Sequence, residues 1–306
     1  YRDSSGRAVA GTVSGSNITF GSEVVFDSNA TSHIDIAFDP NTSGKFCISY
    51  KGQYGTVVVG TVSGTALSFG SAQVFNQAAT EFTSIEFDPN TANKFVVAYK
   101  DTANSNYGTT RVGTVSGTSI TYGPEILFNA AYSLYTSISF DPNTANTFVI
   151  VFMDNSNTNR GTAILGTISG TSITFGAKAV FSSAGNSNYN SVAFDPNTAG
   201  KFVACNADAG NSSYGKAAVG TVSGTSISFG TQVVFNSGST TYTSVAFNPN
   251  DAGKFAVAYT GGGQYGMVSV GTVSGTTISF SPQITYSPGA GTAEDSIAFD
   301  PNDPGK

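Results

Sequence analysis

Few residues of this sequence have side chains with the chemistry that enzymes commonly use. His33 is the only histidine among the 306 residues, and Cys47 and Cys205 are the only cysteines. A general base with its partners, or a metal site rich in histidine, requires several such residues close together. The single histidine therefore argues against both kinds of site.

The other charged residues do not form a recognisable catalytic set. A sialidase-like mechanism requires a cluster of arginines for the substrate carboxylate, and glycoside hydrolysis requires a pair of carboxylates. The arginines are scattered, and the acids without counterparts elsewhere in the sequence have no spacing that favours pairing. We therefore predict that the protein is not an enzyme. These residues are Arg2, Arg7, Arg111 and Arg160, and Glu81, Glu86, Glu125 and Glu294.

The composition also limits the partners. The formal net charge is −6, and the 13 Lys and Arg residues form no basic run, which is unlike a surface that binds nucleic-acid phosphates. No apolar run approaches the roughly 18 residues of a membrane helix, and the first residues are unlike a signal peptide. We expect neither nucleic-acid binding nor membrane insertion.

A motif of about a dozen residues occurs six times. The copy from Val219 to Gly230 reads VGTVSGTSISFG, and a second motif, F-D/N-P-N, recurs with the same spacing. The glycines that open the GTVSG motifs are 49, 53, 53, 54 and 51 residues apart. A fixed period of this length indicates structural repeats. These glycines are Gly11, Gly60, Gly113, Gly166, Gly220 and Gly271, and the second motif begins at Phe38, Phe87, Phe140, Phe194, Phe247 and Phe299.

Each repeat has the pattern of four short strands. One copy has an alternating segment that ends in a proline turn, a continuous apolar segment and a hairpin around a tight turn. These four strands are expected at 83–87, 94–100, 107–117 and 119–129. Four antiparallel strands in about fifty residues, repeated six times, predict an all-β, six-bladed β-propeller. We expect residues 1–306 to form this one domain.

The closing blade of such a propeller would be shared between the two ends of the chain. A first strand at Ser296–Phe299 would join the third and fourth strands near the N-terminus, and no second strand is present for that blade. We therefore expect the natural chain to be longer.

Cys47 and Cys205 fall on second strands three repeats apart, too far for a disulfide, so we predict two buried free thiols.

The strand order resembles that of sialidase-type and related bacterial repeat propellers, in which the hairpin of the third and fourth strands carries an Asp box, S-x-D-x-G-x-T-W. The matching stretch SGTSITFG keeps the serine and the small turn residues but has neither the Asp nor the Trp. The repeats also resemble degenerate F-D-P-N/G-T-V-S-G proteins of marine bacteria and their phages, including tail-fibre and other virion-surface propellers. This resemblance implies an extracellular or virion-surface location, and an oligomer would fit within a fibre or appendage.

Loops that differ between copies indicate the face on which we expect binding. The DPNTA and SGTS turns hardly vary, whereas the loops that lead into the first and third strands do. The position just before the first strand is mostly aromatic, and exposed rings there would stack on sugars or apolar ligands. Alternatively, the rings wedge between blades and bond to neighbouring loops. This position holds His33, Phe82, Tyr135, Tyr189, Tyr242 and Glu294.

Two further sets of loop residues have structural and functional interpretations. A Tyr-Gly pair precedes most third strands, and its glycine is expected to permit a bulge or a tight entry. Aspartates at the start of Asn/Ser-rich loops offer oxygens that suit Ca²⁺, although no bidentate Glu follows them. We expect no cofactor, with calcium as the one candidate. The tyrosines are Tyr54, Tyr107, Tyr214 and Tyr265, with Ser5 and Arg160 in the other copies, and the aspartates are Asp101, Asp154 and Asp208.

Asx turns are expected at the aspartates of the F-D/N-P-N motif. These are Asp39, Asp88, Asp141, Asp195 and Asp300.

The composition, the repeats and the variable loops together favour a non-catalytic binding or structural module on a virion or bacterial surface, which contacts a cell-surface glycan or a protein through its variable loops. Two alternatives stay open: a secreted carbohydrate-active enzyme of the glycosidase or lyase type, and a purely structural spacer repeat in a filament.

Overall fold

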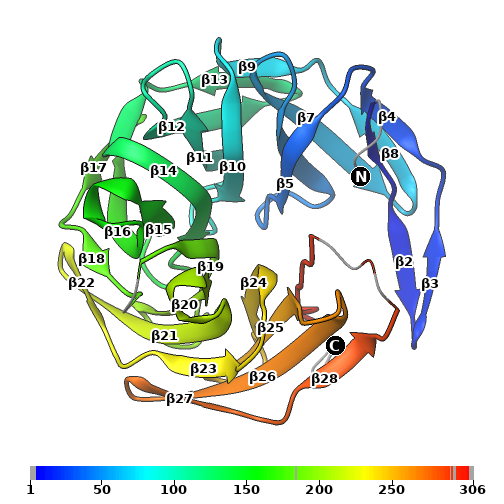
Figure 1. Cartoon of the computed structure of the whole chain (residues 1–306). Coiled ribbons are helices and arrows are strands. Elements are labelled where there is room, and N and C mark those ends of the chain that lie inside the picture. The colour runs from blue at the N-terminus through cyan, green and yellow to red at the C-terminus, as the bar shows by residue number, and fades with distance from the viewer. Residues whose placement is uncertain (1–4, 183–184, 290, 292–293, 303–306) are drawn as a thin grey trace. The chain divides into compact units, whose positions relative to one another are not determined.

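The computed structural model describes residues 5–182, 185–289, 291 and 294–302 (Figure 1). In these ranges the sheets are antiparallel, and the helical elements are two short 3-10 turns, Asn155–Asn157 and Ala209–Asn211. None of the helices described is long and apolar enough to cross a membrane. The all-β class predicted from the sequence is confirmed.

The chain divides into two compact units. The first comprises residues 1–127 and 170–173, and the second residues 128–169 and 174–306. The first unit contains β1 (Gly6–Ala8), β2 (Gly11–Ser14), β3 (Asn17–Phe20), β4 (Val24–Asp27), β5 (Ser32–Phe38), β6 (Lys45–Lys51), β7 (Gly55–Ser63), β8 (Ala66–Phe69), β9 (Gln73–Asn76), β10 (Thr80–Phe87), β11 (Lys94–Asp101), β12 (Tyr107–Ser116) and β13 (Ser119–Tyr122).

The second unit repeats the same plan, and β14 (Ile126–Phe140) runs without a break from the last strand of one repeat into the first strand of the next. The remaining strands are β15 (Thr147–Asp154), β16 (Arg160–Ser169), β17 (Ser172–Phe175), β18 (Ala179–Val180), β19 (Ser187–Phe194), β20 (Lys201–Asp208), β21 (Tyr214–Ser223), β22 (Ser226–Phe229), β23 (Val233–Asn236), β24 (Thr241–Phe247), β25 (Lys254–Thr260), β26 (Gly266–Ser274), β27 (Thr277–Phe280) and β28 (Ile284–Ser287).

The repeats β5–β9, β19–β23 and β24–β28 each fold into one five-stranded antiparallel sheet. The sheet order is β5-β6-β7-β8 in one repeat and β19-β20-β21-β22 in another, and the third strand also pairs with a fifth, β9 or β23 (Figure 1). The central strands β11 and β15 are buried over almost their whole length, as their continuous apolar sequences predict. First strands of consecutive repeats pack against each other, β5 on β10 and β19 on β24.

The predicted single fourth strand is wrong, because two short strands take its place. In the stretch predicted at 119–129, β13 ends at Tyr122 and the chain resumes strand structure at Ile126. Pro124 has no backbone N–H for a ladder. At Gly123 an ideal Cβ would lie 2.0 Å from the carbonyl oxygen of Thr171, in the hairpin turn of the following repeat. The strand therefore breaks where its backbone meets the next hairpin.

The strand predicted at Ser296–Phe299 is also wrong, because this segment is not assigned to a sheet. It still contacts the preceding repeat: Ile297 N–H donates to Ser244 Oγ at 3.2 Å, and Asn250 Nδ2 donates to the carbonyl of Asp300 at 3.4 Å. A strand requires a neighbouring backbone that completes its ladder, and among the described residues no strand pairs with this segment.

The N-terminal repeat has a reduced form of the sheet. β1 pairs with β4, and β2 pairs with β3 as a separate hairpin. In this hairpin Val13 and Phe20 are each 63% exposed, whereas the equivalent strands of other repeats are partly buried. The difference follows from packing, since among the described residues no second strand of its own repeat covers the hairpin.

The first glycine of the GTVSG motif lies under a phenylalanine ring from the second strand. An ideal Cβ at Gly220 would lie 2.1 Å from Cζ of Phe202, which is far inside van der Waals contact. Repetition of the motif is therefore a packing requirement, because every complete repeat places a ring on this backbone position. The five pairs are Gly60 with Phe46, Gly113 with Phe95, Gly166 with Phe148, Gly220 with Phe202, and Gly271 with Phe255.

The aspartate turns join consecutive repeats. The predicted Asx turns are confirmed where Asn41 N–H donates to Asp39 Oδ1 and Asn143 N–H donates to Asp141 Oδ1, both at 2.9 Å. The second oxygen of Asp39 accepts the Asn93 N–H of the next repeat at 3.1 Å. The turns thus hold the repeats together, which explains their constant sequence.

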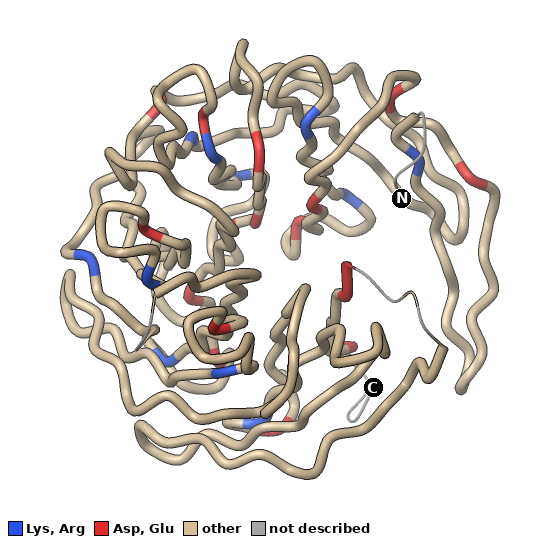
Figure 2. Tube along the Cα trace, in the orientation of Figure 1, with Lys and Arg blue, Asp and Glu red and all other residues tan. Residues whose placement is uncertain are grey.

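Lys and Arg are few and separated along the trace of each unit (Figure 2).

Replacing Gly220 by Ala is expected to lower the free energy of unfolding by about 1–3 kcal/mol, because the added methyl group overlaps the Phe202 ring. Gly262→Ala is the matched control: nothing lies within 4 Å of a Cβ there, so we expect a change within about 0.5 kcal/mol. Urea denaturation measures both variants. Equal unfolding midpoints would contradict the packing argument.

The thiols give a second test. Cys47 and Cys205 are free and fully buried, as predicted, and burial raises the pKa of the Cys47 thiol to about 12 and also raises that of Cys205. Because the thiolate is the reactive form, we expect no reaction with a thiol-specific reagent in the native protein and two modified cysteines after denaturation. Fast labelling of the native protein would show that these strands open.

Candidate functional site

Each first strand contains a β-bulge at the predicted aromatic position. In β10, Glu81 pairs with Lys100 and Ser84 with Ala98, so two residues of β10 lie opposite the single residue Tyr99. The same shift occurs in β5, β14, β19 and β24. A bulge redirects side chains and is common beside functional sites. The first extra residue is His33, Phe82, Tyr135, Tyr189 or Tyr242.

These bulge residues have left-handed backbone conformations. Their φ angles are between 50° and 52°, and Glu294 at the sixth equivalent position has φ 60°. For a residue with a side chain this conformation costs roughly 1–2 kcal/mol, and bulky residues rarely adopt it. The same strain therefore recurs in five strands, each time at a ring-bearing residue. Strain that surrounding structure maintains is often found where a protein binds ligands.

The bulges place rings of consecutive repeats in contact. In the first unit, the ring centroids of His33 and Phe82 are 4.9 Å apart. In the second unit, Tyr189 lies 5.0 Å from Tyr135 and 4.8 Å from Tyr242. All five rings are partly exposed. The structure thus combines features of both interpretations from the sequence, because the rings pack between repeats and also meet solvent.

Hydrogen bonds along the backbone fix this arrangement. Thr83 Oγ1 donates to the carbonyl oxygen of His33, and Thr243 Oγ1 donates to that of Tyr189. Each bond joins the bulge of one repeat to the bulge of the next. The aromatic residues are therefore held by both their backbones and their rings.

The three tyrosine hydroxyls influence one another. Burial raises the pKa of Tyr135, and the nearby phenol of Tyr242 raises it further. The pKa of Tyr189 is also raised, first by burial and then by Tyr135 and Tyr242. Three phenol groups therefore lie on rings that are in tilted contact, which offers apolar faces and hydrogen-bonding groups together.

A charged group borders the other aromatic pair. Lys100 Nζ lies 5.5 Å from the centre of the Phe82 ring and 2.6 Å from Glu81 Oε2. Lys51 Nζ lies 3.0 Å from the second oxygen of Glu81. The hydrogen bond from Lys100, with that from Lys51, lowers the pKa of Glu81 to about 2, although partial burial opposes this. Glu81 is thus an anion that orients both lysines.

Glu294 has the left-handed backbone of the five aromatic bulge residues, but it has no ring and its side chain is exposed. The six equivalent positions from His33 to Glu294 are called the column below, and Tyr135, Tyr189 and Tyr242 are its tyrosines. The adjacent Asp295 is the bonded residue, because it accepts hydrogen bonds from Thr260 Oγ1 and the Tyr286 hydroxyl. Partial burial, with the hydrogen bond and charge of the Asp295 carboxylate, raises the pKa of Tyr286 to about 12. The last position of the column is therefore chemically different from the first five.

In the Tyr-Gly pairs, the glycine has a structural role, because a phenylalanine ring packs against its backbone. At Gly215 an ideal Cβ would lie 2.3 Å from the Phe235 ring, and at Gly55 it would lie 2.6 Å from Phe75. The preceding tyrosines differ in exposure: Tyr54 and Tyr265 are exposed, whereas Tyr107 and Tyr214 are partly buried.

Two of the three calcium candidates are paired with lysines. Asp154 Oδ1 accepts bonds from the Ser156 N–H and Asn129 Nδ2, and its Oδ2 lies 3.0 Å from Lys178 Nζ. Asp208 Oδ2 lies 2.7 Å from Lys216 Nζ. Among the described residues no group of three His, Cys, Asp or Glu side chains is placed to hold a metal.

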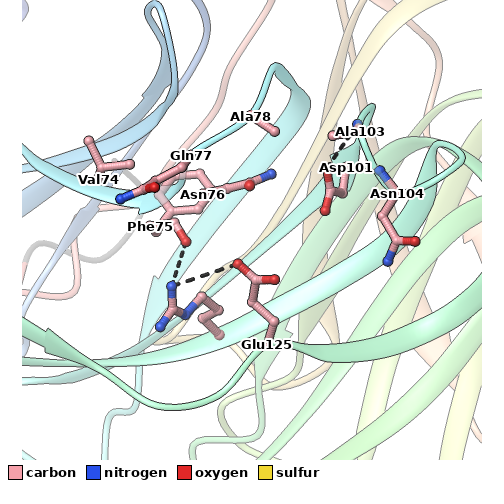
Figure 3. A pocket seen from close by; sticks show the side chains of 10 residues that line it. Val74, Phe75, Asn76, Gln77, Ala78, Asp101, Ala103, Asn104 and Glu125 are labelled. Atoms are coloured by element: carbon pink, nitrogen blue, oxygen red, sulfur yellow. Dashed lines mark hydrogen bonds and ion pairs between the residues drawn. The ribbon is translucent and has the colours of Figure 1, made fainter.

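The third candidate, Asp101, lines an open cavity of about 580 Å³ within the first unit (Figure 3). Asp101 ends β11 and Asn104 follows it, Asn76 ends β9 and Gln77 follows it, and Glu125 lies beyond β13. Sequence reasoning missed this cavity because residues distant in sequence form it. One signal was available: Arg111 is the only charged residue at a third-strand position that holds Val58, Ile164, Ala218 or Ser269 in other repeats.

Backbone carbonyls hold Arg111 in place. Its Nη1 donates to the carbonyl of Phe75 at 2.7 Å, and its Nε and Nη2 donate to that of Gly123 at 2.9 and 2.8 Å. Glu125 Oε1 lies 3.8 Å from Nη1, and Figure 3 shows both interactions of this nitrogen. The guanidinium therefore supports the wall of the cavity.

Tyr242 offers a test of the strained bulge. At an ordinary strand position Ala is more stabilising than Gly by roughly 0.5–1 kcal/mol, but at φ 51° the order should reverse. We expect Tyr242→Gly to be more stable than Tyr242→Ala by about 0.5–1 kcal/mol. The same pair of substitutions at the exposed Val234 of β23 should show the ordinary order. Urea denaturation gives both differences, and the same order at both sites would disprove the strain.

No family model and no curated protein matches the sequence. Solved structures are similar in fold. A protein of unknown function from Dyadobacter fermentans has a TM-score of 0.58 and 13% identity, with 86% of this chain and 84% of that chain covered. Sqt1 from Chaetomium thermophilum has a TM-score of 0.53 and 12% identity, with 88% and 64% covered. This chain therefore spans less than two thirds of the Sqt1 chain.

AofleA from Arthrobotrys oligospora is also similar, with a TM-score of 0.55, 9% identity, and 86% of this chain and 74% of that chain covered. A second AofleA structure is of a variant with three arginines replaced by alanine, at positions 97, 150 and 203 and thus 53 residues apart. Two of the intervals between GTVSG glycines in this chain are also 53 residues. At these identities the similarity shows the fold alone.

Proposed function

We propose that the protein is a non-catalytic binding module that recognises a glycan through the aromatic bulge residues of its first strands. In this proposal the repeated sheets are the blades of a six-repeat β-propeller, and the whole chain is one domain. The repeat period and the packing of first strands on each other support that architecture. The variable loops beside those strands form the binding face.

The observation that carries the proposal is the contact between Tyr135, Tyr189 and Tyr242 at strained bulges. The tyrosines retain left-handed backbones that glycine would adopt at lower cost, while their rings stay partly exposed. Sugar rings present C–H faces and hydroxyl groups. Stacked aromatic faces with clustered phenols complement both features.

The described arginines support a role without catalysis. Arg7 Nη1 lies 3.1 Å from Glu23 Oε2, and Arg111 is bonded to two backbone carbonyls. The ring of the single histidine, His33, packs against Phe82. These residues stabilise the fold, whereas a sialidase-like mechanism would need arginines gathered around a substrate carboxylate.

The proposed setting is a virion or bacterial surface, where the module belongs to a fibre or other appendage and contacts a cell-surface glycan. The resemblance of the F-D-P-N and GTVSG repeats to virion-surface propellers supports this setting. A protein partner on the same face is the alternative, and the binding experiment distinguishes the two.

A glycan array probed with the purified protein tests the proposal. We expect binding by the wild type and at least about a tenfold loss when Tyr135, Tyr189 and Tyr242 are all replaced by glycine. Nucleobase stacking on an aromatic side chain contributes roughly 1–3 kcal/mol per ring, and we expect three sugar-stacking rings together to contribute at least as much as one such contact. Glycine is chosen because relief of backbone strain offsets part of the lost packing.

Two control variants accompany this test. Replacement of the same tyrosines by Phe keeps the rings and should retain more binding than the glycine variant. Replacement of the exposed Val74 of β9 and Val234 of β23 by Ala should leave binding unchanged. Absence of glycan binding by the wild type would overturn the glycan assignment, and full binding by a folded glycine variant would exclude the tyrosine column as the site.

A further inference from the structure

We propose that the cavity beside Asn76, Asp101 and Glu125 is a second binding site, which accepts the primary ammonium group of a small amino sugar. The site lies in the first unit and does not include the tyrosine column, so it is independent of the glycan site proposed above. Its occupant is identified by comparing the same positions in successive repeats.

In the next repeat a lysine occupies the corresponding place. Lys178 is equivalent to Glu125, because each lies two residues after the glycine that ends the hairpin and three before the phenylalanine of the last strand. Lys178 Nζ donates to Asn129 Oδ1 and to Asp154 Oδ2, the latter at 3.0 Å. Asn129 and Asp154 are the equivalents of Asn76 and Asp101. An amide oxygen and a carboxylate thus bind an ammonium group in this position of the fold.

The repeat after that uses another lysine for the same purpose. Asp208 is equivalent to Asp101 and Asp154, and Lys216 Nζ lies 2.7 Å from its Oδ2. Both of these aspartates are therefore neutralised by a lysine of the chain. A buried carboxylate is unfavourable unless such a partner compensates its charge.

Asp101 has no corresponding lysine. It is 5% exposed, its Oδ1 accepts the N–H groups of Ala103 and Asn104, and no ion pair involves it among the described residues. Asn76 is 6% exposed, and its side-chain Nδ2 donates to Thr80 Oγ1. In the described part of the chain, its side-chain oxygen Oδ1 accepts no hydrogen bond. The two acceptors that bind Lys178 elsewhere are both present here without the lysine.

The surroundings add negative charge. Glu125 takes the place of the lysine, and the Arg111 guanidinium next to it is held by the Phe75 and Gly123 carbonyls. Asp101, Glu125 and Arg111 together give the lining one net negative charge.

A buried hydroxyl group lies near the two acids of this site. Tyr99 is fully buried, and its hydroxyl has no hydrogen-bond partner among the described residues. Burial raises its pKa, and the charges of Glu125 and then Asp101 raise it further, so the hydroxyl lies within the field of both acids that line the cavity. Tyr99 is not among the residues that line the cavity, so its hydroxyl bears on the site only through the charges of Glu125 and Asp101.

The size and lining of the cavity define the rest of the ligand. A volume of about 580 Å³ is within the range of small-molecule sites. The amides of Asn76, Gln77 and Asn104 line it with the two acids (Figure 3). Amide groups both donate and accept hydrogen bonds, as sugar hydroxyls require. An amine that also carries hydroxyl groups fits this combination.

Ligand-observed NMR titration tests the proposal, with glucosamine as the probe in its protonated form. Glucose and N-acetylglucosamine are the matched ligands, because both lack the ammonium group. We expect glucosamine to bind at least about tenfold more tightly than either, which is the effect of one charge-assisted hydrogen bond. Equal affinities for glucose and glucosamine would overturn the ammonium assignment. Equal affinity for cadaverine, which has no hydroxyl groups, would overturn the amino-sugar assignment.

Substitutions locate the site. Asp101→Asn keeps an oxygen for the Ala103 and Asn104 N–H groups but removes the charge, so we expect at least about a tenfold weaker affinity for glucosamine. Glu125→Lys reproduces the arrangement of Lys178, and its own ammonium should block the ligand without lowering the unfolding midpoint. Unchanged affinity for glucosamine in both folded variants would refute the site.

Lys178→Ala provides the converse test in the second unit. It leaves the acceptors of Asn129 and Asp154 without their lysine, and we expect weak glucosamine binding to appear there in the Glu125→Lys background. If Lys178→Ala unfolds, the Glu125→Lys result decides the proposal alone. Glycan binding by the tyrosine column should be the same in every variant, which separates failure of this proposal from failure of the first.

Discussion

The fold depends on backbone positions where no side chain fits. Within each complete repeat the ring of a second-strand phenylalanine lies directly on the glycine of the third strand, as Phe202 does on Gly220. Between repeats, the glycine after the hairpin meets the turn of the next hairpin, as Gly230 meets Thr276, whose oxygen would be 1.9 Å from an ideal Cβ. A ring or a carbonyl this close makes even alanine destabilising, because neighbouring atoms must shift. These two contacts set how the strands of a repeat pack and where the next repeat begins.

Those contacts explain where the sequence is constant and where it varies. The hairpin turns and the aspartate turns carry the bonds between repeats, such as Asp141 Oδ2 with the Gly200 N–H at 3.0 Å, so each copy needs the same residues. The loops at the other ends of the strands carry fewer such bonds and differ in length and charge. Loops of this kind on a rigid support are suited to binding. The aromatic bulges lie at the starts of the first strands, next to these loops.

Local patterns predicted the strands whose neighbours belong to the same repeat. The second and third strands, the Asx turns and the buried thiols follow from apolar runs and motif spacing within about fifty residues. The break after Tyr122 did not follow, because it depends on Thr171 in the next hairpin. Alignment of repeats found the aromatic positions, but their left-handed backbone was not foreseen, since bulky residues such as tyrosine and phenylalanine rarely adopt it. The cavity requires Asn76, Asp101 and Glu125 together, and no local pattern joins residues so far apart.

Repetition makes departures from the pattern informative. Asp154 and Asp208 have lysines and Asp101 has none, although the three aspartates have the same place in the pairing of the second and third strands. The charged residues around Asp101 therefore set its repeat apart. A buried carboxylate without a counterion costs stability that substitution of one residue, Glu125, by lysine would restore. The left-handed backbone of the aromatic bulge residues in five strands also lowers the free energy of unfolding. Features that lower stability while the rest of each repeat follows a consistent plan are expected at functional sites. Both candidate sites of this protein are identified by that criterion.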